Sequence, residues 1–106
     1  MTSLVQTIIP EIRTALTTIY GSRMVKLLLF GSQARGDADP GSDIDLLVVL
    51  KDPVNPCEEI SRVSLDTSRL SLAYNTVISC LFMQEDRYLN ENSPLLLNIR
   101  REGVVI

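Results

Sequence analysis

The chain has 106 residues, of which 45% are hydrophobic, and its formal net charge at pH 7 is −3. This length predicts a single domain over residues 1–106 with enough apolar residues for one core, and it leaves self-association or a partner open as a further source of stability. The acidic balance and the lack of a Lys/Arg run argue against a dedicated nucleic-acid surface.

Residue types that are rare or missing limit which catalytic groups the chain can use and indicate the cellular compartment in which it works. Cys57 and Cys80 lack metal-ligand spacing and are expected to be reduced thiols in a cytoplasmic protein. No apolar run reaches the roughly 18 residues of a membrane span, and the start of the chain lacks the charged region of a signal peptide. Because the chain has no histidine, catalysis would have to use carboxylates, Arg, Lys, Tyr, Ser or a metal.

The first predicted element is a helix from Thr2 or Ser3 to about Tyr20. A hydroxyl residue can cap its start, and a Gly-Ser pair follows its end. Pro10 lies inside the pattern, so the helix either begins near Pro10 or is kinked there. The apolar stripe that defines the helix consists of Leu4, Ile8, Ile12, Leu16 and Ile19.

Two buried strands are predicted at Met24–Phe30 and Ile44–Leu50, because both runs are nearly all apolar and rich in branched residues. Between them, residues 37–42 form a turn-forming cluster of Asp, Pro, Gly and Ser. The connection is too short for a crossover helix, although it can hold one helical turn. We therefore expect an antiparallel or otherwise adjacent pair of strands.

The second half of the chain is predicted to return to helices around a third strand. In order, the elements are a helix from Cys57, a strand over Tyr74–Met83, a short helical turn over 84–92 and a helix from Ser93-Pro94 through Arg101. The first of these helices has a clear pattern only as far as Asp66. β-Branched and aromatic residues indicate the strand, and the Ser-Pro pair is a typical helix start.

The stretch from Leu27 to Leu50 combines a phosphate-binding pattern with a pair of carboxylates. Gly31-Ser32 leads from a strand into a helix start, whose first N–H groups lack an intrahelical partner and can bind a phosphate. Asp43 and Asp45 are one residue apart at the head of a strand, so they project from the same face and can hold a hard cation. This stretch predicts one site for a metal and a triphosphate.

The order Gly31-Ser32, ten intervening residues and Asp43-Ile44-Asp45 resembles the signature of the nucleotidyltransferase superfamily with the DNA polymerase β-like fold. The strings GSQARG and SDIDLLV are similar to its minimal nucleotidyltransferase branch, small proteins commonly encoded beside a HEPN-domain partner. The resemblance implies an α/β (α+β) fold in which a small mixed sheet is flanked by helices.

The same resemblance implies roles for the residues of the motif. Asp43 and Asp45 would be catalytic and would bind Mg²⁺, a hard ion that prefers oxygen ligands. Gly31 and Ser32 would hold the β and γ phosphates of ATP or another nucleoside triphosphate.

Two further polar residues of the motif have alternative roles. Arg35 either adds positive charge to the nucleotide phosphates or pairs with Asp37 or Asp39 to brace the loop. Ser42 is expected to contribute to nucleotide binding by capping or bracing the turn before Asp43 rather than as a ligand.

One position departs from the family pattern. Active members carry a third carboxylate on a later strand, and the predicted strand Tyr74–Met83 has none. By position, Asn75 is the match for this catalytic residue, with Ser79 as a candidate on the same face. Asn75 is otherwise a turn residue that opens the strand. An Asn side chain can ligate a metal through its carbonyl oxygen, but it cannot accept a proton as a base.

Two functions are consistent with these features. The first is transfer of a nucleoside monophosphate, AMP from ATP, to a hydroxyl acceptor, and by resemblance the acceptor is a tyrosine of a HEPN toxin for which this chain is the antitoxin. The alternative is a nucleotide-binding module that neutralises or regulates a partner by contact with weak or no turnover. Asn75 is the residue that favours the alternative.

Overall fold

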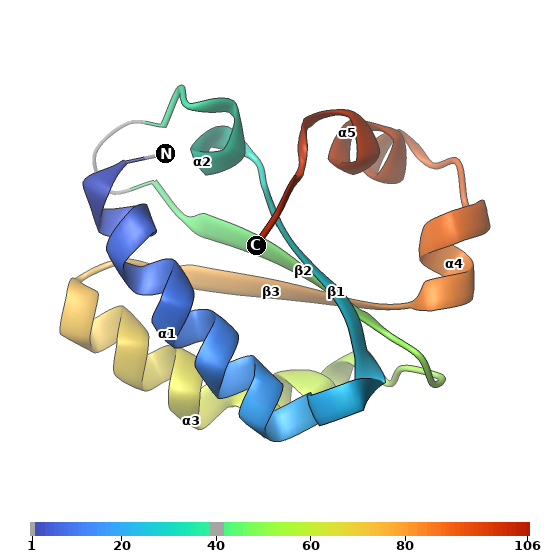
Figure 1. Cartoon of the computed structure of the whole chain (residues 1–106), viewed down its shortest axis with the longest axis horizontal. Helices are drawn as coiled ribbons and strands as arrows, with labels where there is room; N and C mark the ends of the chain where they lie inside the picture. The colour runs from blue at the N-terminus through green and yellow to red at the C-terminus, as the bar shows by residue number, and fades with distance from the viewer. Residues whose placement is uncertain (1, 39–41) are drawn as a thin grey trace.

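The computed structural model describes residues 2–38 and 42–106 (Figure 1). In chain order, its elements are α1 (Ser3–Tyr20), a 3₁₀ turn η1 (Gly21–Arg23), β1 (Met24–Phe30), α2 (Ser32–Arg35), β2 (Ile44–Leu50), α3 (Pro56–Tyr74), β3 (Ile78–Gln84), α4 (Glu85–Asn90), α5 (Pro94–Glu102) and β4 (Val104–Val105). The mixed α/β class expected from the sequence is confirmed. None of the helices in the described ranges is long and apolar enough to cross a membrane.

The strands form one mixed sheet in the order β3-β2-β1-β4. β1 pairs antiparallel with β2 on one side and with the short β4 on the other, while β2 and β3 are parallel and are connected through α3. The predicted antiparallel pair is therefore confirmed, and its connection holds the single helical turn α2. The central position of β2 places the residues at its start between two neighbouring strands.

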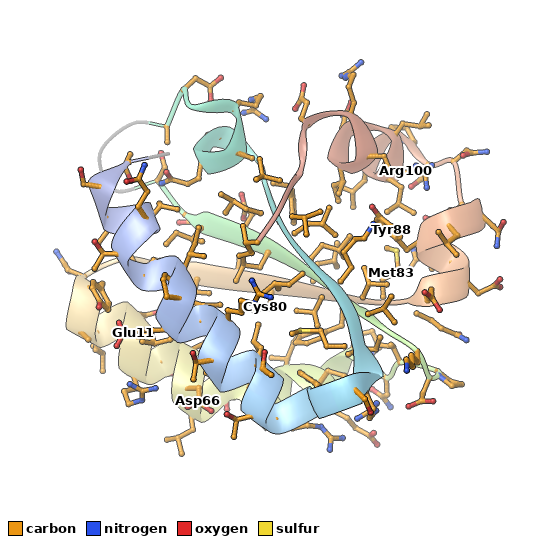
Figure 2. The ribbon with its side chains drawn as sticks, in the orientation of Figure 1. Glu11, Asp66, Cys80, Met83, Tyr88 and Arg100 are labelled. Carbon is orange, nitrogen blue, oxygen red and sulfur yellow. The ribbon has the colours of Figure 1, made fainter. Side chains whose placement is uncertain are left out.

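Helices cover both faces of this sheet. Figure 1 shows α1 and α3 side by side along one face, with α4 and α5 on the opposite side. The larger core lies under α1 and α3 and includes Leu29, Leu46, Val48, Val63 and Phe82. The smaller core lies under α4 and α5 and consists of Leu28, Leu47, Val49, Met83, Tyr88, Leu96 and Ile99. Figure 2 shows Met83 and Tyr88 together on the α4 side of the sheet.

Helix α1 has its predicted bounds, but its buried stripe differs from the predicted one. It runs without a break from Ser3 to Tyr20 through Pro10, so the helix does not begin at Pro10. The backbone N–H of Val5 donates to the Thr2 hydroxyl, which confirms the cap. The buried stripe consists of Val5, Ile8, Ile12, Leu16 and Tyr20, so the predicted members Leu4 and Ile19 lie at its margin rather than in its centre.

The largest correction concerns the boundary between α3 and β3. Helix α3 continues to Tyr74, well beyond Asp66, and β3 begins only at Ile78. Asn75 has φ 51° in the left-handed region and its N–H donates to the Ser71 carbonyl, so it is the C-cap of α3. An asparagine tolerates this conformation better than most residues, and it ends the helix where the sequence predicted the strand to begin.

Helices α4 and α5 lie where the sequence predicted a helical turn and a final helix. The Leu96 N–H donates to the Ser93 hydroxyl, which confirms the cap of α5. In this helix Leu96 and Ile99 are buried, while Leu95 and Leu97 are about half exposed at 47% and 51%. The strand β4 was not predicted from the sequence, because two residues carry no detectable pattern.

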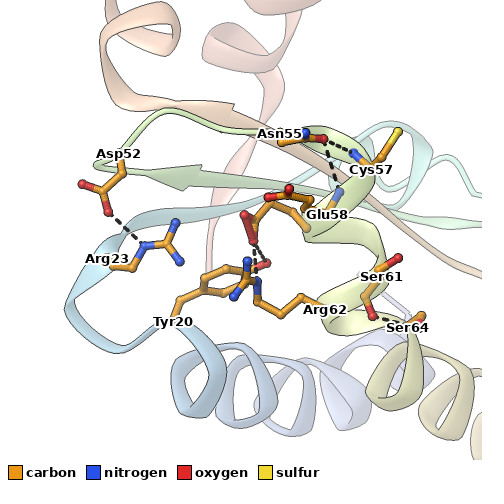
Figure 3. Close-up of polar contacts among 10 residues, drawn as sticks. Tyr20, Arg23, Asp52, Asn55, Cys57, Glu58, Ser61, Arg62 and Ser64 are labelled. Carbon is orange, nitrogen blue, oxygen red and sulfur yellow. Dashed lines mark hydrogen bonds and ion pairs between the residues drawn. The ribbon is translucent and has the colours of Figure 1, made fainter.

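A polar cluster joins the end of α1 to the start of α3 (Figure 3). The Tyr20 hydroxyl donates to Glu59 Oε1 over 3.0 Å, and Arg62 Nε lies 2.9 Å from the same oxygen. Burial raises the pKa of Tyr20, and the Glu59 carboxylate raises it further. Glu59 is 3% exposed, so this charge is held inside the fold by two partners.

Candidate functional site

Asp45 lies at the start of β2, on the face of the sheet that α5 covers. Alternation along the strand places it on the same face as Leu47 and Val49, which belong to the smaller core. Its register partners are Phe30 on β1 and Ser79 on β3. Because paired residues project from the same face of a sheet, Asp45 is flanked by an aromatic ring and by a hydroxyl group.

Asp43 directly precedes β2 and is exposed, while Asp45 is partly buried. The Ile44 N–H between them donates to the Val77 carbonyl over 2.8 Å, which ties this segment to the residues before β3. The pKa of Asp45 is raised, first by burial and then by the negative charge of Asp43. Within residues 2–38 and 42–106, neither carboxylate forms an ion pair. Two uncompensated carboxylates fit a hard divalent cation, so this pair suits Mg²⁺.

Gly31 lies against the carboxylate of Asp45. Its φ is 73° and its ψ is −157°, a conformation that is almost exclusive to glycine. A Cβ at this position would lie 2.5 Å from Asp45 Oδ2, where a real contact is too close. The structure therefore requires glycine at residue 31 for two reasons, its backbone conformation and the approach of the carboxylate.

The turn after Gly31 carries backbone N–H groups without intrahelical partners close to Asp45. The N–H groups of Ala34 and Arg35 donate to the Gly31 carbonyl, and those of Gly36 and Asp37 donate to the Ser32 carbonyl. The first two N–H groups of α2 precede this pattern and have no partner within the helix. Together with the Ser32 hydroxyl they can donate to the oxygens of a phosphate held next to a cation.

Gln33 joins this turn to the segment that carries Asp43. Its side chain is only 4% exposed, and its Nε2 donates to the Ser42 carbonyl over 3.3 Å. This contact uses the backbone carbonyl of Ser42, and the expected role of its side chain as a cap or brace stays a prediction. Gln33 lies within the sequence motif, but nothing in the pattern of a four-residue helix shows which of its side chains is buried.

Arg35 points toward α5 in this structure. Its Nε lies 3.3 Å from Asp37 and its Nη1 lies 3.5 Å from Glu102. These carboxylates raise the pKa of Arg35, with Asp37 as the larger cause. The pair with Asp37 is one of the two alternatives left open by the sequence, while Asp39, the other partner considered, lies outside the described residues.

The position of the third acid differs from the sequence prediction. Asn75 was expected on the strand, but it caps α3 and is exposed, so it lies outside the row of residues that pair with β2. The residue in register with Asp45 is Ser79, which was the further candidate. In the described part of the chain, no group of three or more His, Cys, Asp or Glu side chains is close enough to hold a metal.

A small cleft adjoins Gly31 on the α5 side of the sheet. Its volume is about 140 Å³, and its lining residues are Phe30, Gly31, Arg35, Leu95, Asn98, Ile99 and Glu102. A larger groove of about 440 Å³ lies between α1 and α3 and contains none of the motif residues. The chemistry of the motif therefore favours the smaller cleft as the neighbourhood of the site.

The mixed sheet, the glycine turn after β1 and the carboxylate pair at the start of β2 together define a nucleotidyltransferase-like fold. Comparison with protein families agrees, since residues 9–93 match the Nucleotidyltransferase domain family. This match covers most of the chain. The chain belongs to the Nucleotidyltransferase domain family.

Two relatives come from Methanocaldococcus jannaschii, and each is named a candidate protein adenylyltransferase. One is 38% identical over 72 residues, which are 68% of this chain and 72% of the relative. The other is 34% identical over 99 residues, which are 92% of this chain and 93% of the relative.

Solved structures share the fold at low sequence identity. A toxin-antitoxin structure with AMP-PNP has a TM-score of 0.67 and 18% identity, and the match covers 91% of this chain and 69% of that one. A complex of a tri-AMPylated HEPN toxin of Shewanella oneidensis with its MNT antitoxin has a TM-score of 0.63 and 16% identity, with 94% and 69% covered. These similarities confirm the minimal nucleotidyltransferase fold expected from the motif.

Proposed function

We propose that this chain is a Mg²⁺-dependent adenylyltransferase that moves AMP from ATP to a hydroxyl acceptor, a tyrosine of a HEPN partner. The observation that carries the proposal is the packing of Gly31 against Asp45, which brings the open N–H groups of α2 next to an uncompensated carboxylate pair. The names of the relatives and the AMPylated toxin of the neighbouring structure support the choice of AMP and of the acceptor.

Three side chains and the backbone of α2 would carry out the separate roles in this transfer. Asp43 and Asp45 would hold Mg²⁺, which when bound supplies positive charge to the phosphate oxygens. Ser32 and the first N–H groups of α2 would orient the triphosphate by donating hydrogen bonds to it. The acceptor oxygen then forms a bond to the α-phosphorus, the bond to the bridging oxygen breaks, and pyrophosphate leaves with that electron pair. The acceptor proton passes to solvent.

A tyrosine acceptor suits a site without a third carboxylate. A phenol has a pKa near 10, well below that of an aliphatic alcohol, so it needs less help in losing its proton. The residue beside Asp45 is Ser79, which is a poor base. The proposal places the chain in the cytoplasm, where ATP and the partner are available.

The test uses ATP labelled on either the α or the γ phosphate, with Mg²⁺ and the product of the neighbouring gene. We expect stable label on the partner from α-labelled ATP only, and peptide mapping should place it on a tyrosine. Asp43→Ala and Asp45→Ala should abolish transfer. Asp52→Ala is the matched control, because Asp52 is an exposed carboxylate beyond the opposite end of β2. Equal labelling by Asp45→Ala would contradict the proposal.

The second candidate is a binding module that neutralises its partner by contact. The observation that favours it is Ser79 at the position in register with Asp45, where active relatives of the motif are expected to carry an acid. In that case Asp43→Ala would leave neutralisation of the partner intact while nucleotide binding is lost. Loss of neutralisation in the same variant would exclude contact alone as the mechanism.

A further inference from the structure

Gln33 is a buried residue of the phosphate turn whose side chain contacts the segment that carries Asp43. It follows Ser32 directly in α2, and its Nε2 donates to the carbonyl of Ser42, the residue before Asp43. The side chain is 4% exposed, so water competes little for this hydrogen bond. This hydrogen bond connects the phosphate turn to the segment that carries Asp43, in addition to the packing of Gly31 against Asp45.

The backbone around Asp43 is held on both sides. On the N-terminal side the Ser42 carbonyl accepts from Gln33 over 3.3 Å, and on the C-terminal side the Ile44 N–H donates to the Val77 carbonyl over 2.8 Å. Asp43 itself is exposed and has no ion pair among the described residues. Its position thus depends on the two flanking peptide groups rather than on contacts of its own carboxylate.

The amide of Gln33 is also an exception to the usual pairing of buried polar atoms. Its Oε1 is buried and has no hydrogen-bond partner among the described residues, the only buried side-chain N or O atom there of which this is true. Native structures contain few such atoms, and each calls for an explanation. An apolar side chain of the same length would fill the space without leaving an unpaired oxygen, so the advantage of an amide lies in its donor.

We propose that Gln33 is a positioning residue that fixes Asp43 for metal binding by holding the Ser42 carbonyl, and so couples the phosphate turn to the metal site. This inference rests on the proposed function only in that Asp43 and Asp45 bind a divalent cation. It predicts that loss of the donor weakens metal binding without a matching loss of fold stability. Partners that orient metal ligands typically contribute 10- to 100-fold to metal affinity.

The test measures binding of Mn²⁺ to the whole chain by electron paramagnetic resonance, with and without ATP, together with the melting temperature. Gln33→Met keeps the length of the side chain and removes the donor and the unpaired oxygen. We expect Mn²⁺ affinity to fall by about tenfold, with an unchanged or higher melting temperature. Gln84→Met is the matched control, because Gln84 lies at the end of β3 far from Asp45 in register, and its Mn²⁺ affinity should equal that of the native protein.

Several outcomes separate this inference from the proposed function. Native protein that binds Mn²⁺ through Asp43 but transfers no AMP contradicts the transferase and leaves the role of Gln33 standing. Equal Mn²⁺ affinity in Gln33→Met and native protein overturns the inference, as does a native protein whose Mn²⁺ binding does not require Asp43. If Gln33→Met does not fold, Gln33→Asn decides, since it keeps the amide but withdraws it by one methylene. An Mn²⁺ affinity of Gln33→Asn equal to native would then overturn the inference.

Discussion

Gly31 and Asp45, which belong to different halves of the sequence motif, are packed so closely that a Cβ on residue 31 would lie 2.5 Å from Asp45 Oδ2. We expect Gly31→Ala to displace the carboxylate and to force an unfavourable backbone conformation, at a cost of about 1–3 kcal/mol. Nucleotide transfer and Mn²⁺ binding should fall by at least about tenfold, because small shifts of metal ligands are costly. Thermal unfolding and Mn²⁺ titration measure the two effects.

Gly36 provides the control for this substitution. It also has a positive φ, 81°, but a Cβ there would meet nothing within 4 Å. Gly36→Ala should therefore lower stability by about 1 kcal/mol through its backbone alone and leave Mn²⁺ affinity unchanged. If both variants weakened Mn²⁺ binding equally, the contact between residues 31 and 45 would not be the cause.

The ionised side chain of Asp45, the proposed metal ligand, should lower the stability of the metal-free protein. Its pKa is raised by burial and by Asp43, which means that the ionised side chain is less favourable in the folded than in the unfolded chain. Above that pKa, Asp45→Asn should raise the melting temperature of the metal-free protein. Asp43→Asn removes the same repulsion without relieving burial, so its rise should be smaller.

Addition of Mg²⁺ and ATP should reverse this order of stability. A ligand that binds only the folded state stabilises it, so the native protein should gain melting temperature while Asp45→Asn gains little. Differential scanning fluorimetry with and without the two ligands measures both effects. If metal-free Asp45→Asn melted at a lower temperature than the native protein, the ionised Asp45 side chain would not destabilise the fold, and the prediction would be wrong.

Ser79 is the position at which to restore a third carboxylate. Ser79→Asp places an acid in register with Asp45, where it can ligate the metal or accept the proton of the acceptor hydroxyl. General-base catalysis contributes about 10²–10⁴-fold, so a rise in transfer rate of about tenfold or more is expected if the native site is limited by the missing base. Without metal, the variant should be less stable than native because of three neighbouring negative charges.

Asn75→Asp is the matched control for Ser79→Asp. Both substitutions add one carboxylate, but Asn75 caps α3 outside the strand, so this variant should leave the transfer rate unchanged. If Asn75→Asp raised the transfer rate and Ser79→Asp did not, pairing in register with Asp45 would not be what determines the position of a third carboxylate. Transfer of α-labelled AMP under single-turnover conditions measures both variants.

The parts of the site that could be predicted are those determined by local pattern. The strands Met24–Phe30 and Ile44–Leu50, with Gly31 and the carboxylate pair at their facing ends, follow from apolar runs and turn residues close in sequence. Asn75 was misplaced because YNTVISCLFM reads as one strand, whereas the αL conformation of Asn75 allows a helix to end inside it.

Features that depend on register and burial lie beyond a sequence pattern. Ser79 lies beside Asp45 only because β2 and β3 are parallel with one particular register. The role of Gln33 depends on a hydrogen bond to residue 42, nine positions away and made by a backbone carbonyl. Neither relationship leaves a periodic signal in the amino-acid sequence.

The two cysteines should differ sharply in reactivity. Cys57 is exposed at the start of α3, while Cys80 lies on β3 against the larger core, where burial raises the pKa of its thiol to about 11. Because the thiolate is the reactive form, a disulfide reagent at pH 8 should label Cys57 quickly and Cys80 much more slowly in the folded protein. Mass spectrometry after timed labelling measures the difference, and rapid labelling of Cys80 in the folded protein would contradict the burial.

The raised pKa of Cys80 also makes the stability of the fold depend on pH. The thiol ionises near pH 9 in the unfolded chain and near pH 11 in the folded chain. As the pH rises between these values, ionisation stabilises the unfolded state, so the free energy of unfolding falls. The contribution of Cys80 is fully present below pH 9 and is lost as the pH rises through 11, at a cost of about 3 kcal/mol at most. Urea unfolding at pH 8, 9.5 and 11 measures this effect. The free energy of unfolding should fall less with pH in Cys80→Ala than in the native protein, and in Cys57→Ala it should fall as much as in the native protein.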